Sequence, residues 1–284
     1  MRNIIELNSF SAVGPGQTAN LVIEPGVTYD SIYIESALKA DIEHITLKLN
    51  GEEILPRMTV AEIEAIQYRK GHRPVDQTNE YVELPLQLRD ALYDGTQRVT
   101  GLVVGPGDNC VLDVKIKSSA VAPVLSAFSE TRGFPGMRSV VRKFERLTVP
   151  SAAAGKVDFT SMQRGSRLLK VYFMAPFAIN GLEIIRDSAK VWELSKDRAR
   201  LIHGSYGADC DVDDTAGIKY VFDPVREGFP LKDAFSTQAN ALNFKIETGG
   251  AGNIEVLIER LEPFAANWSA KAAPVAKRKA TGRR

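Results

Sequence analysis

"YVELPLQLRDAL" at residues 81–92 and "YVFDPVREGFPLKDAF" at residues 220–235 are two versions of one pattern. Both begin with Tyr-Val, both have a proline a few residues later, and both close on a basic residue, Asp-Ala and a large apolar residue. One short match can arise by chance, so its meaning depends on whether the neighbouring segments repeat in the same order.

The neighbouring segments do repeat in order, as a strand, a hairpin, a helix, the opening motif, and a strand pair around a Gly-rich turn. Their spacing of about 140 residues varies little, and the variation falls in loops. This indicates a tandem duplication. The pairs are 28–36 with 167–175, 45–55 with 182–194, 59–71 with 195–207, 81–92 with 220–235, and 101–119 with 241–263.

The turns and helix ends of the repeat have recognisable chemistry. Asn50-Gly51 favours a type I′ hairpin turn, because both central residues of that turn need positive φ. Asp187-Ser188 is a weaker version at the same place in the second half.

Hydroxyl residues begin both predicted helices. Thr59 and Ser195 are suited to accept the free amide protons at a helix start, and Glu62 completes a capping box in the first helix. Gly71 and Gly207 suit the positive φ that ends a helix.

Each half contains about eight short strands separated by turn residues, with one clear helix. This predicts an all-β fold of two tandem eight-stranded jelly rolls, with one short helix in each. We expect domains at 1–122 and 140–265, a linker at 123–139 and a tail at 266–284. The alternative is that all antiparallel β domains look alike at this level, but the helix in the same place in both halves argues against it.

Composition favours an ordinary globular chain. The 284 residues are 44% hydrophobic and 25% charged, enough for two cores. Cys110 and Cys210 give no disulfide framework, which favours a reducing compartment and two buried or idle thiols. The first residues lack the pattern of a signal peptide, and no run of 18 apolar residues exists to span a membrane.

The last residues are strongly basic, whereas the remainder is mildly acidic. We expect this tail to be mobile, since it alternates cations with Ala, Pro and Gly. Its partners would be anionic lipid, nucleic acid or acidic patches on neighbouring subunits, and lipid or a neighbouring protein is preferred. The plain alternative is a solubilising end. The cations are Lys271, Lys277, Arg278, Lys279, Arg283 and Arg284.

At this point the sequence resembles a known family, the double jelly-roll major capsid proteins of icosahedral bacteriophages with an internal membrane, most closely the corticovirus type. The resemblance runs to about Phe264, and its specificity lies in the order and spacing of its parts. These are "IIELNSF" at 4–10, "LKLNGEEIL" at 47–55, "APVLSAF" at 122–128, "LIHGSYG" at 201–207 and "IEVLIERLE" at 254–262.

The resemblance implies a coat protein that forms homotrimers, which tile a shell over a lipid vesicle. Three copies of two similar domains give a nearly hexagonal outline. It further implies vertex or minor capsid proteins as partners, assembly in the host cytoplasm and a place in the virion capsid. Nucleic acid is not an expected partner, because a membrane would separate the shell from the genome. The basic tail departs from the family pattern, so its role does not follow from the resemblance.

Enzyme signatures are missing. His44, His72 and His203 lack metal-site spacing, and no nucleophile elbow or complete phosphate loop occurs. We therefore expect no catalytic residues. Two other classes stay open: a carbohydrate- or receptor-binding β-sandwich module, which would expose aromatic residues in loops, and a hydrolase on paired sandwiches, which would need convergent carboxylates.

One acidic loop is the only candidate cofactor site. Asp209, Asp211, Asp213 and Asp214 alternate in "DCDVDD", and carboxylate oxygens are ligands that Ca²⁺ prefers. However, the glycine and glutamate of a calcium loop are replaced by Asp214 and Tyr220. The alternatives are a structural calcium site and a solvated acidic loop.

Overall fold

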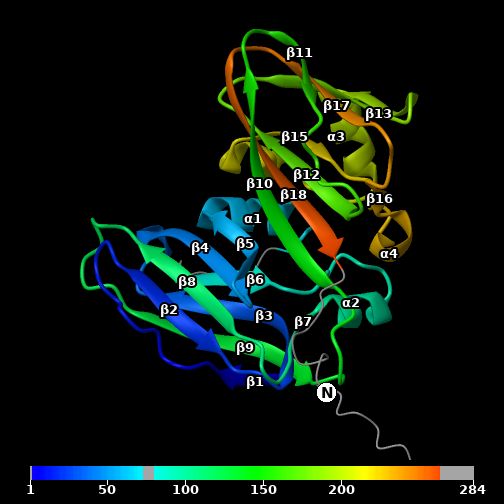
Figure 1. Cartoon of the computed structure of the whole chain (residues 1–284). Helices are drawn as coiled ribbons and strands as arrows, with labels where there is room; N and C mark the ends of the chain where they lie inside the picture. The colour runs from blue at the N-terminus through cyan, green and yellow to red at the C-terminus, as the bar shows by residue number, and fades with distance from the viewer. Residues whose placement is uncertain (1, 73–79, 263–284) are drawn as a thin grey trace, which may run out of the picture.

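Antiparallel strands from the two halves of the chain form four sheets, which pack as two separate pairs (Figure 1). This computed structural model describes residues 2–72 and 80–262. The basic tail predicted at 266–284 lies outside the described residues.

The first domain pairs a sheet of order β1-β9-β3-β6, with β7 added to β3, and a sheet of order β2-β8-β4-β5. This is the strand order of a jelly roll. Its strands are β1 (Asn3–Glu6), β2 (Thr18–Ile23), β3 (Val27–Ser36), β4 (Ile42–Leu49), β5 (Glu52–Met58), β6 (Tyr81–Pro85), β7 (Leu102–Val104), β8 (Cys110–Ile116) and β9 (Leu125–Gly133).

The second domain repeats this topology strand for strand, with sheets of order β10-β18-β12-β15, to which β16 is added, and β11-β17-β13-β14. The double jelly roll is therefore confirmed. Its strands are β10 (Val141–Ser151), β11 (Gly155–Phe159), β12 (Arg167–Met174), β13 (Ile179–Arg186), β14 (Ala189–Ser195), β15 (Ile218–Phe222), β16 (Phe235–Ser236), β17 (Leu242–Thr248) and β18 (Gly252–Glu262).

The predicted helices are present as α1 (Val60–Arg69) and α3 (Lys196–Ser205), each following the second strand of its hairpin. The prediction of one helix per domain is too low, because the described residues also include α2 (Asp94–Thr100) and α4 (Pro230–Asp233). Both are too short to show helical periodicity in sequence. The described residues also form 3₁₀ turns η1 (Lys39–Asp41) and η2 (Asp211–Ala216).

Local chemistry accounts for most of the turns and caps. Thr59 Oγ1 accepts from the Glu62 amide at 3.2 Å, while Glu62 Oε2 accepts from the Thr59 amide at 2.8 Å, so the capping box is confirmed. Ser195 stands at the N-cap of α3 but makes no capping hydrogen bond through its side chain. Asn50 and Gly51 have φ of 55° and 83°, the positive values that a type I′ turn needs.

The linker predicted at 123–139 is wrong over most of its length. Residues 125–133 are β9, which pairs with both β1 and β3 in the middle of a sheet. The error comes from the predicted match of 101–119 with 241–263. The first segment contains β7 and β8 but the second contains β17 and β18, so the match is displaced by one strand. In the structure β8 corresponds to β17 and β9 to β18, whereas the predicted pairing leaves β9 without a counterpart. The chain that joins the domains is the short stretch between β9 and β10.

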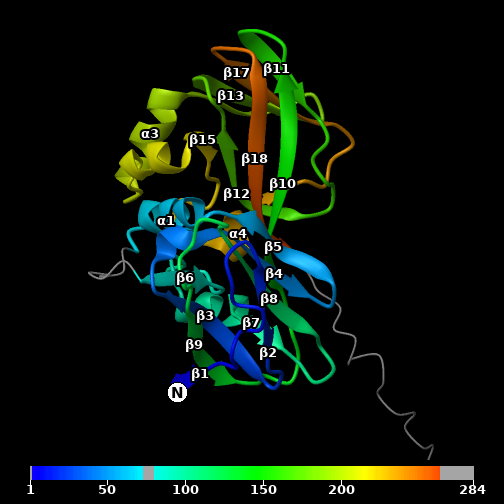
Figure 2. The ribbon, with the colours of Figure 1, turned by 90° about the vertical axis from the view of Figure 1, so that its left-hand side faces the viewer.

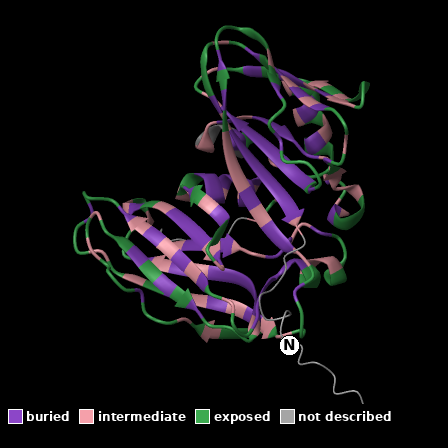
Figure 3. Cartoon of the chain, in the orientation of Figure 1, coloured by how far each residue is buried: buried purple, intermediate pink, exposed green. Residues whose placement is uncertain are grey.

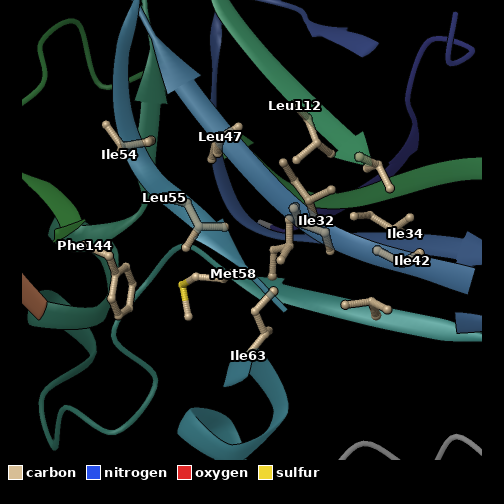
Figure 4. Packing of buried hydrophobic residues seen from close by; sticks show 14 of the residues in the cluster. Ile32, Ile34, Ile42, Leu47, Ile54, Leu55, Met58, Ile63, Leu112 and Phe144 are labelled. Carbon is tan, nitrogen blue, oxygen red and sulfur yellow. The ribbon is translucent and has the colours of Figure 1, made fainter. Parts of the chain in front are cut away.

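Buried residues gather between the paired sheets of each domain and at the junction of the two domains (Figure 3). Within the first domain, side chains such as Ile32, Leu47 and Leu112 fill the space between the sheets (Figure 4). In the second, Phe173, Phe222 and other apolar side chains form the equivalent core. No helix in the described part of the chain is both long and apolar enough to cross a membrane.

Candidate functional site: the interface between the two jelly rolls

One sheet of the second domain, β10-β18-β12-β15, is covered on both faces. On β12, Val171 and Phe173 point into the domain's own core, while Tyr172 and Met174 belong to the core cluster of the first domain. The segment "RLLKVYFM" is therefore buried at every position after Arg167. Double burial explains why this strand shows only loose alternation of apolar and polar residues in the sequence.

The apolar part of the interface centres on Phe144 of β10. Its ring lies beside Met58 and Leu55 of β5 (Figure 4), and all three side chains belong to one buried cluster. Leu257 of β18 and Val221 of β15 join the same cluster. The two jelly rolls thus share a continuous hydrophobic contact, which favours one fixed arrangement of the domains.

A network of buried charges adjoins this apolar contact. Lys170 Nζ lies 3.0 Å from Asp90 Oδ2 of the first domain and 3.3 Å from Asp223 Oδ2 of the second. Lys70 Nζ, from the end of α1, lies 3.2 Å from Glu259 Oε1 on β18 and 3.5 Å from Asp90 Oδ2. Each domain therefore contributes a lysine that pairs with a carboxylate of the other domain.

Glu259 is the most heavily engaged carboxylate of the network. Arg142 Nε donates to its Oε1 at 2.8 Å, and the Tyr172 hydroxyl donates to Oε2 at 3.0 Å. Arg142 also donates to the carbonyl of Pro85 in the first domain at 2.7 Å. Each of these hydrogen bonds to a charged group replaces water lost on burial.

Two effects compete in setting the pKa values of the network: burial disfavours the charged form of each group, and neighbouring opposite charges favour it. Burial disfavours the Glu259 carboxylate, but Arg142, Lys70 and Lys170 outweigh it and lower the pKa of Glu259 to about 2. The same competition lowers the pKa of Asp90 and raises that of Lys170. In Lys70 burial dominates and lowers the pKa. In Asp223 burial dominates as well and raises the pKa.

A second contact joins the end of α1 to the loop before β15. Arg69 pairs with Asp213, and Arg69 Nη2 lies 2.9 Å from Nδ1 of His203 on α3. The Asp209 amide donates to the Arg69 carbonyl at 3.0 Å. Figure 2 shows α3 above α1 on the same side of the molecule. The loop therefore contacts the first domain through Asp209 and Asp213, while the side chain of Asp211 is exposed.

The described carboxylates that were predicted to bind calcium each have a different partner in the structure. Asp213 pairs with Arg69, Asp211 Oδ1 accepts from Arg200 Nη2 at 2.8 Å, and Asp209 Oδ1 accepts from the Asp211 amide. The side chain of Asp214 lies outside the described residues. Among the side chains that the structure describes, no group of three from His, Cys, Asp or Glu is arranged to hold a metal ion. Calcium binding stays a prediction.

The other predicted site residues are placed as follows. The tail residues Lys271, Lys277, Arg278, Lys279, Arg283 and Arg284 lie outside the described residues. Cys110 and Cys210 are free and buried. His72 and His203, distant in sequence, line one cleft between the domains, whereas His44 lies on β4.

Sequence reasoning missed the interface charges, although the sequence contains a signal for them. Lys170 and Glu259 interrupt the apolar runs "RLLKVYFM" and "IEVLIERLE". A charge inside a buried strand needs a partner, so such residues indicate an ion pair or a contact with another domain.

The equivalent face of the first domain carries aromatic side chains. Tyr33 of β3 stacks on Phe128 of β9 with ring centroids 4.8 Å apart, and Tyr81 meets Phe128 edge-on at 6.4 Å. All three rings are partly exposed. Ile4 of the edge strand β1 is 73% exposed. Tyr33 on β3 pairs with Phe128 on β9. In the second domain the equivalent pair is Tyr172 on β12 with Leu257 on β18.

Comparison with known proteins agrees with this architecture. The family model for the viral coat protein P2 N-terminal domain matches residues 4–132, and that for the viral coat protein P2 C-terminal domain matches residues 141–264. No curated protein sequence matches the chain.

Three solved structures illustrate the similarity of the fold. The crystal structure of the major capsid protein P2 from bacteriophage PM2 is 19% identical, with 94% of this chain and 99% of that chain covered and a TM-score of 0.82. The atomic structure of Sulfolobus turreted icosahedral virus is 10% identical, with 96% and 94% covered and a TM-score of 0.58. The PBCV-1 virus capsid is 9% identical, with 92% and 93% covered and a TM-score of 0.57.

Proposed function

The chain belongs to the viral coat protein P2 family and is a capsid protein, and from this premise we propose that it forms homotrimers of pseudo-hexagonal outline that tile an icosahedral shell. The proposal includes an internal lipid membrane beneath the shell, as the family resemblance implies. Neighbouring trimers and vertex or minor capsid proteins are its proposed partners.

The main support for the proposal is a difference between equivalent faces of the two domains: one is buried within the chain, and the other is partly exposed. The outer face of β10-β18-β12-β15 packs on the first domain through Tyr172, Leu257 and Phe144. The outer face of β1-β9-β3-β6 has Tyr33 and Phe128 at the positions equivalent to Tyr172 and Leu257, and these rings stay partly exposed.

A second copy of the chain supplies a partner for that face. If the second domain of a neighbouring copy docks on it as the two domains dock within the chain, the contact repeats head to tail. Such a contact closes into a ring when the rotation is right, and three copies of two domains complete a ring of six. Aromatic side chains are enriched in such contacts.

Exposed apolar residues at the domain junction support further contacts in the shell. Leu92 and Tyr93 are 67% and 64% exposed, and the Tyr93 ring lies 5.5 Å from that of Phe229. Large exposed apolar side chains that cluster in this way mark interaction surfaces.

The basic tail is proposed to bind anionic lipid or a neighbouring protein, with assembly taking place in the host cytoplasm. The test is flotation with vesicles that contain anionic lipid. Lipid binding predicts that the full chain floats, that rising salt reduces flotation, and that deletion of 271–284 abolishes it. Equal flotation after the deletion contradicts the lipid role.

The test of the coat-protein proposal is negative-stain imaging of the purified chain. We expect single particles with a six-cornered outline and three-fold symmetry. Elongated two-lobed particles of one chain each would contradict the proposal.

A further inference from the structure

A cleft of about 370 Å³ opens between the two jelly rolls, beside the buried charge network. Its walls come from the end of α1, the end of α3 and the segment that follows β15. The volume is within the range of small-molecule sites and is large enough for several water molecules. Of the residues assigned above to contacts in the shell, only Leu92 lines this cleft.

Arg226 is the unusual residue of this cleft. Its guanidinium carbon lies 5.5 Å from the ring centre of Tyr206 and 5.9 Å from that of Trp192, so aromatic rings hold the flat group in place. In the part of the chain that the structure describes, its guanidinium has neither a hydrogen-bond acceptor nor a carboxylate partner. Its Nε is buried without an acceptor. The flat guanidinium fork matches the geometry of carboxylate and phosphate groups, and proteins favour Arg for binding them.

Two further N–H groups without acceptors belong to residues of the same wall. Nε of Arg69 is buried and has no acceptor. His203 is only 1% exposed and takes the Arg69 N–H at its Nδ1, which leaves the proton on Nε2. That Nε2 also has no acceptor. Buried polar atoms without partners are costly, and these three donors, together with Nε2 of His72, belong to residues that line this one cleft.

Two of the three carboxylates that line the cleft are already in use, while the third, Glu227, is exposed to solvent. Asp90 and Asp223 pair with Lys170, and the Asp223 Oδ1 also accepts from the Val225 amide at 3.1 Å. The lining therefore offers unpaired donors and positive charge, while its described carboxylates next to the network are neutralised. This composition selects a ligand that has only acceptors and carries negative charge.

We propose that this cleft binds a small multivalent oxyanion, with Arg226 as its principal ligand and His203 and Arg69 lining the site. A phosphate-type group satisfies several donors from different directions at once. Since the cleft lies between the domains, the bound anion contacts both of them.

The test is calorimetric titration of the purified full chain with inorganic phosphate, at an ionic strength held constant with chloride. We expect saturable binding of one phosphate per chain. Arg226→Gln should weaken it at least tenfold, because the guanidinium is lost. Arg226→Lys should give an intermediate affinity, because it keeps the charge without the flat, stacked donor pair.

The matched control is Arg186→Gln. Arg186 also stacks on an aromatic ring, with its guanidinium carbon 5.5 Å from the centre of the Phe235 ring, but it does not line the cleft. Its loss should leave phosphate affinity unchanged. Circular dichroism and elution volume check that each variant is folded. Absence of saturable binding to the unmodified chain, or equal affinity in folded Arg226→Gln, overturns the proposal.

Discussion

Lys170 of the second jelly roll lies between Asp90 and Asp223, at 3.0 Å and 3.3 Å from their Oδ2 atoms. The two aspartates come from the two copies of the repeated motif, at 81–92 and 220–235. One lysine therefore ties both copies together across the domain boundary. This ion pair is a direct contact between the halves of the duplication.

Asp90→Asn should weaken the junction between the domains. Lys170 and Lys70 lose a carboxylate in a buried site, although Lys170 keeps Asp223. We expect the free energy of unfolding in urea to fall by about 2 to 3 kcal/mol. The control is Asp94→Asn, which removes an exposed pair with Arg98 and should cost less than about 0.5 kcal/mol. Equal effects of the two variants would contradict the interface argument.

Acid should destabilise the fold through His203. Burial, with help from Arg69 and Lys170, lowers the pKa of His203 to about 3, against about 6.5 in an unfolded chain. As the pH falls below 6.5 the unfolded chain takes up the proton first, so stability is lost down to the folded pKa. We expect a loss of about 3 kcal/mol between pH 7 and pH 4.

The same experiment on His203→Gln identifies the source of this pH dependence. Urea unfolding at a series of pH values should show a flatter profile for that variant between pH 7 and pH 4. The comparison variant is His44→Gln: His44 is half-buried on β4 and burial also lowers its pKa, so this variant should flatten the profile less than His203→Gln does. An unchanged slope in His203→Gln would rule out His203 as the cause.

Glu62 has two roles, in the capping box of α1 and in a contact with the second domain. Arg146 Nη2 lies 2.9 Å from both Glu62 carboxylate oxygens. Glu62→Gln keeps an acceptor for the cap but loses the charge. In a double-mutant cycle with Arg146→Met we expect a coupling of about 1 kcal/mol, and a clearly smaller coupling in the matching cycle for the exposed pair Lys190 and Glu193. Equal couplings would assign Glu62 to the cap alone.

Phe128→Asp should break the proposed contact between copies without unfolding the chain. A charge on the partly exposed face of β1-β9-β3-β6 is unfavourable in an interface but tolerable in water. We expect monomers in size-exclusion chromatography with an unchanged circular dichroism spectrum. The control Val22→Asp, on β2 of the opposite sheet and 59% exposed, should keep the oligomer. A Phe128→Asp variant that stays oligomeric would place the contact elsewhere.

The repeat could be predicted from sequence because its turns and caps rest on local chemistry. Asn50-Gly51 and Asp187-Ser188 all have positive φ, and Thr59 forms the capping box with Glu62. These features depend on residues close in the chain, so a single sequence contains them.

Pairing between distant strands was harder to predict. β9 contains "SAFSET", whose many small polar residues hide its strand pattern, so the sequence alone favours a linker there. The interface network depends on contacts such as that of Lys70 with Glu259, far apart in the chain. Only the fold brings such charges together, and the sequence shows at most that a charge interrupts an apolar run.

The proposed trimer forms through the exposed face of the first jelly roll. Light scattering coupled to size exclusion tests this by measuring the mass of the purified protein. A trimer gives a species of three times the 31.1 kDa chain mass. A species that stays at the mass of one chain over the whole accessible concentration range would contradict it.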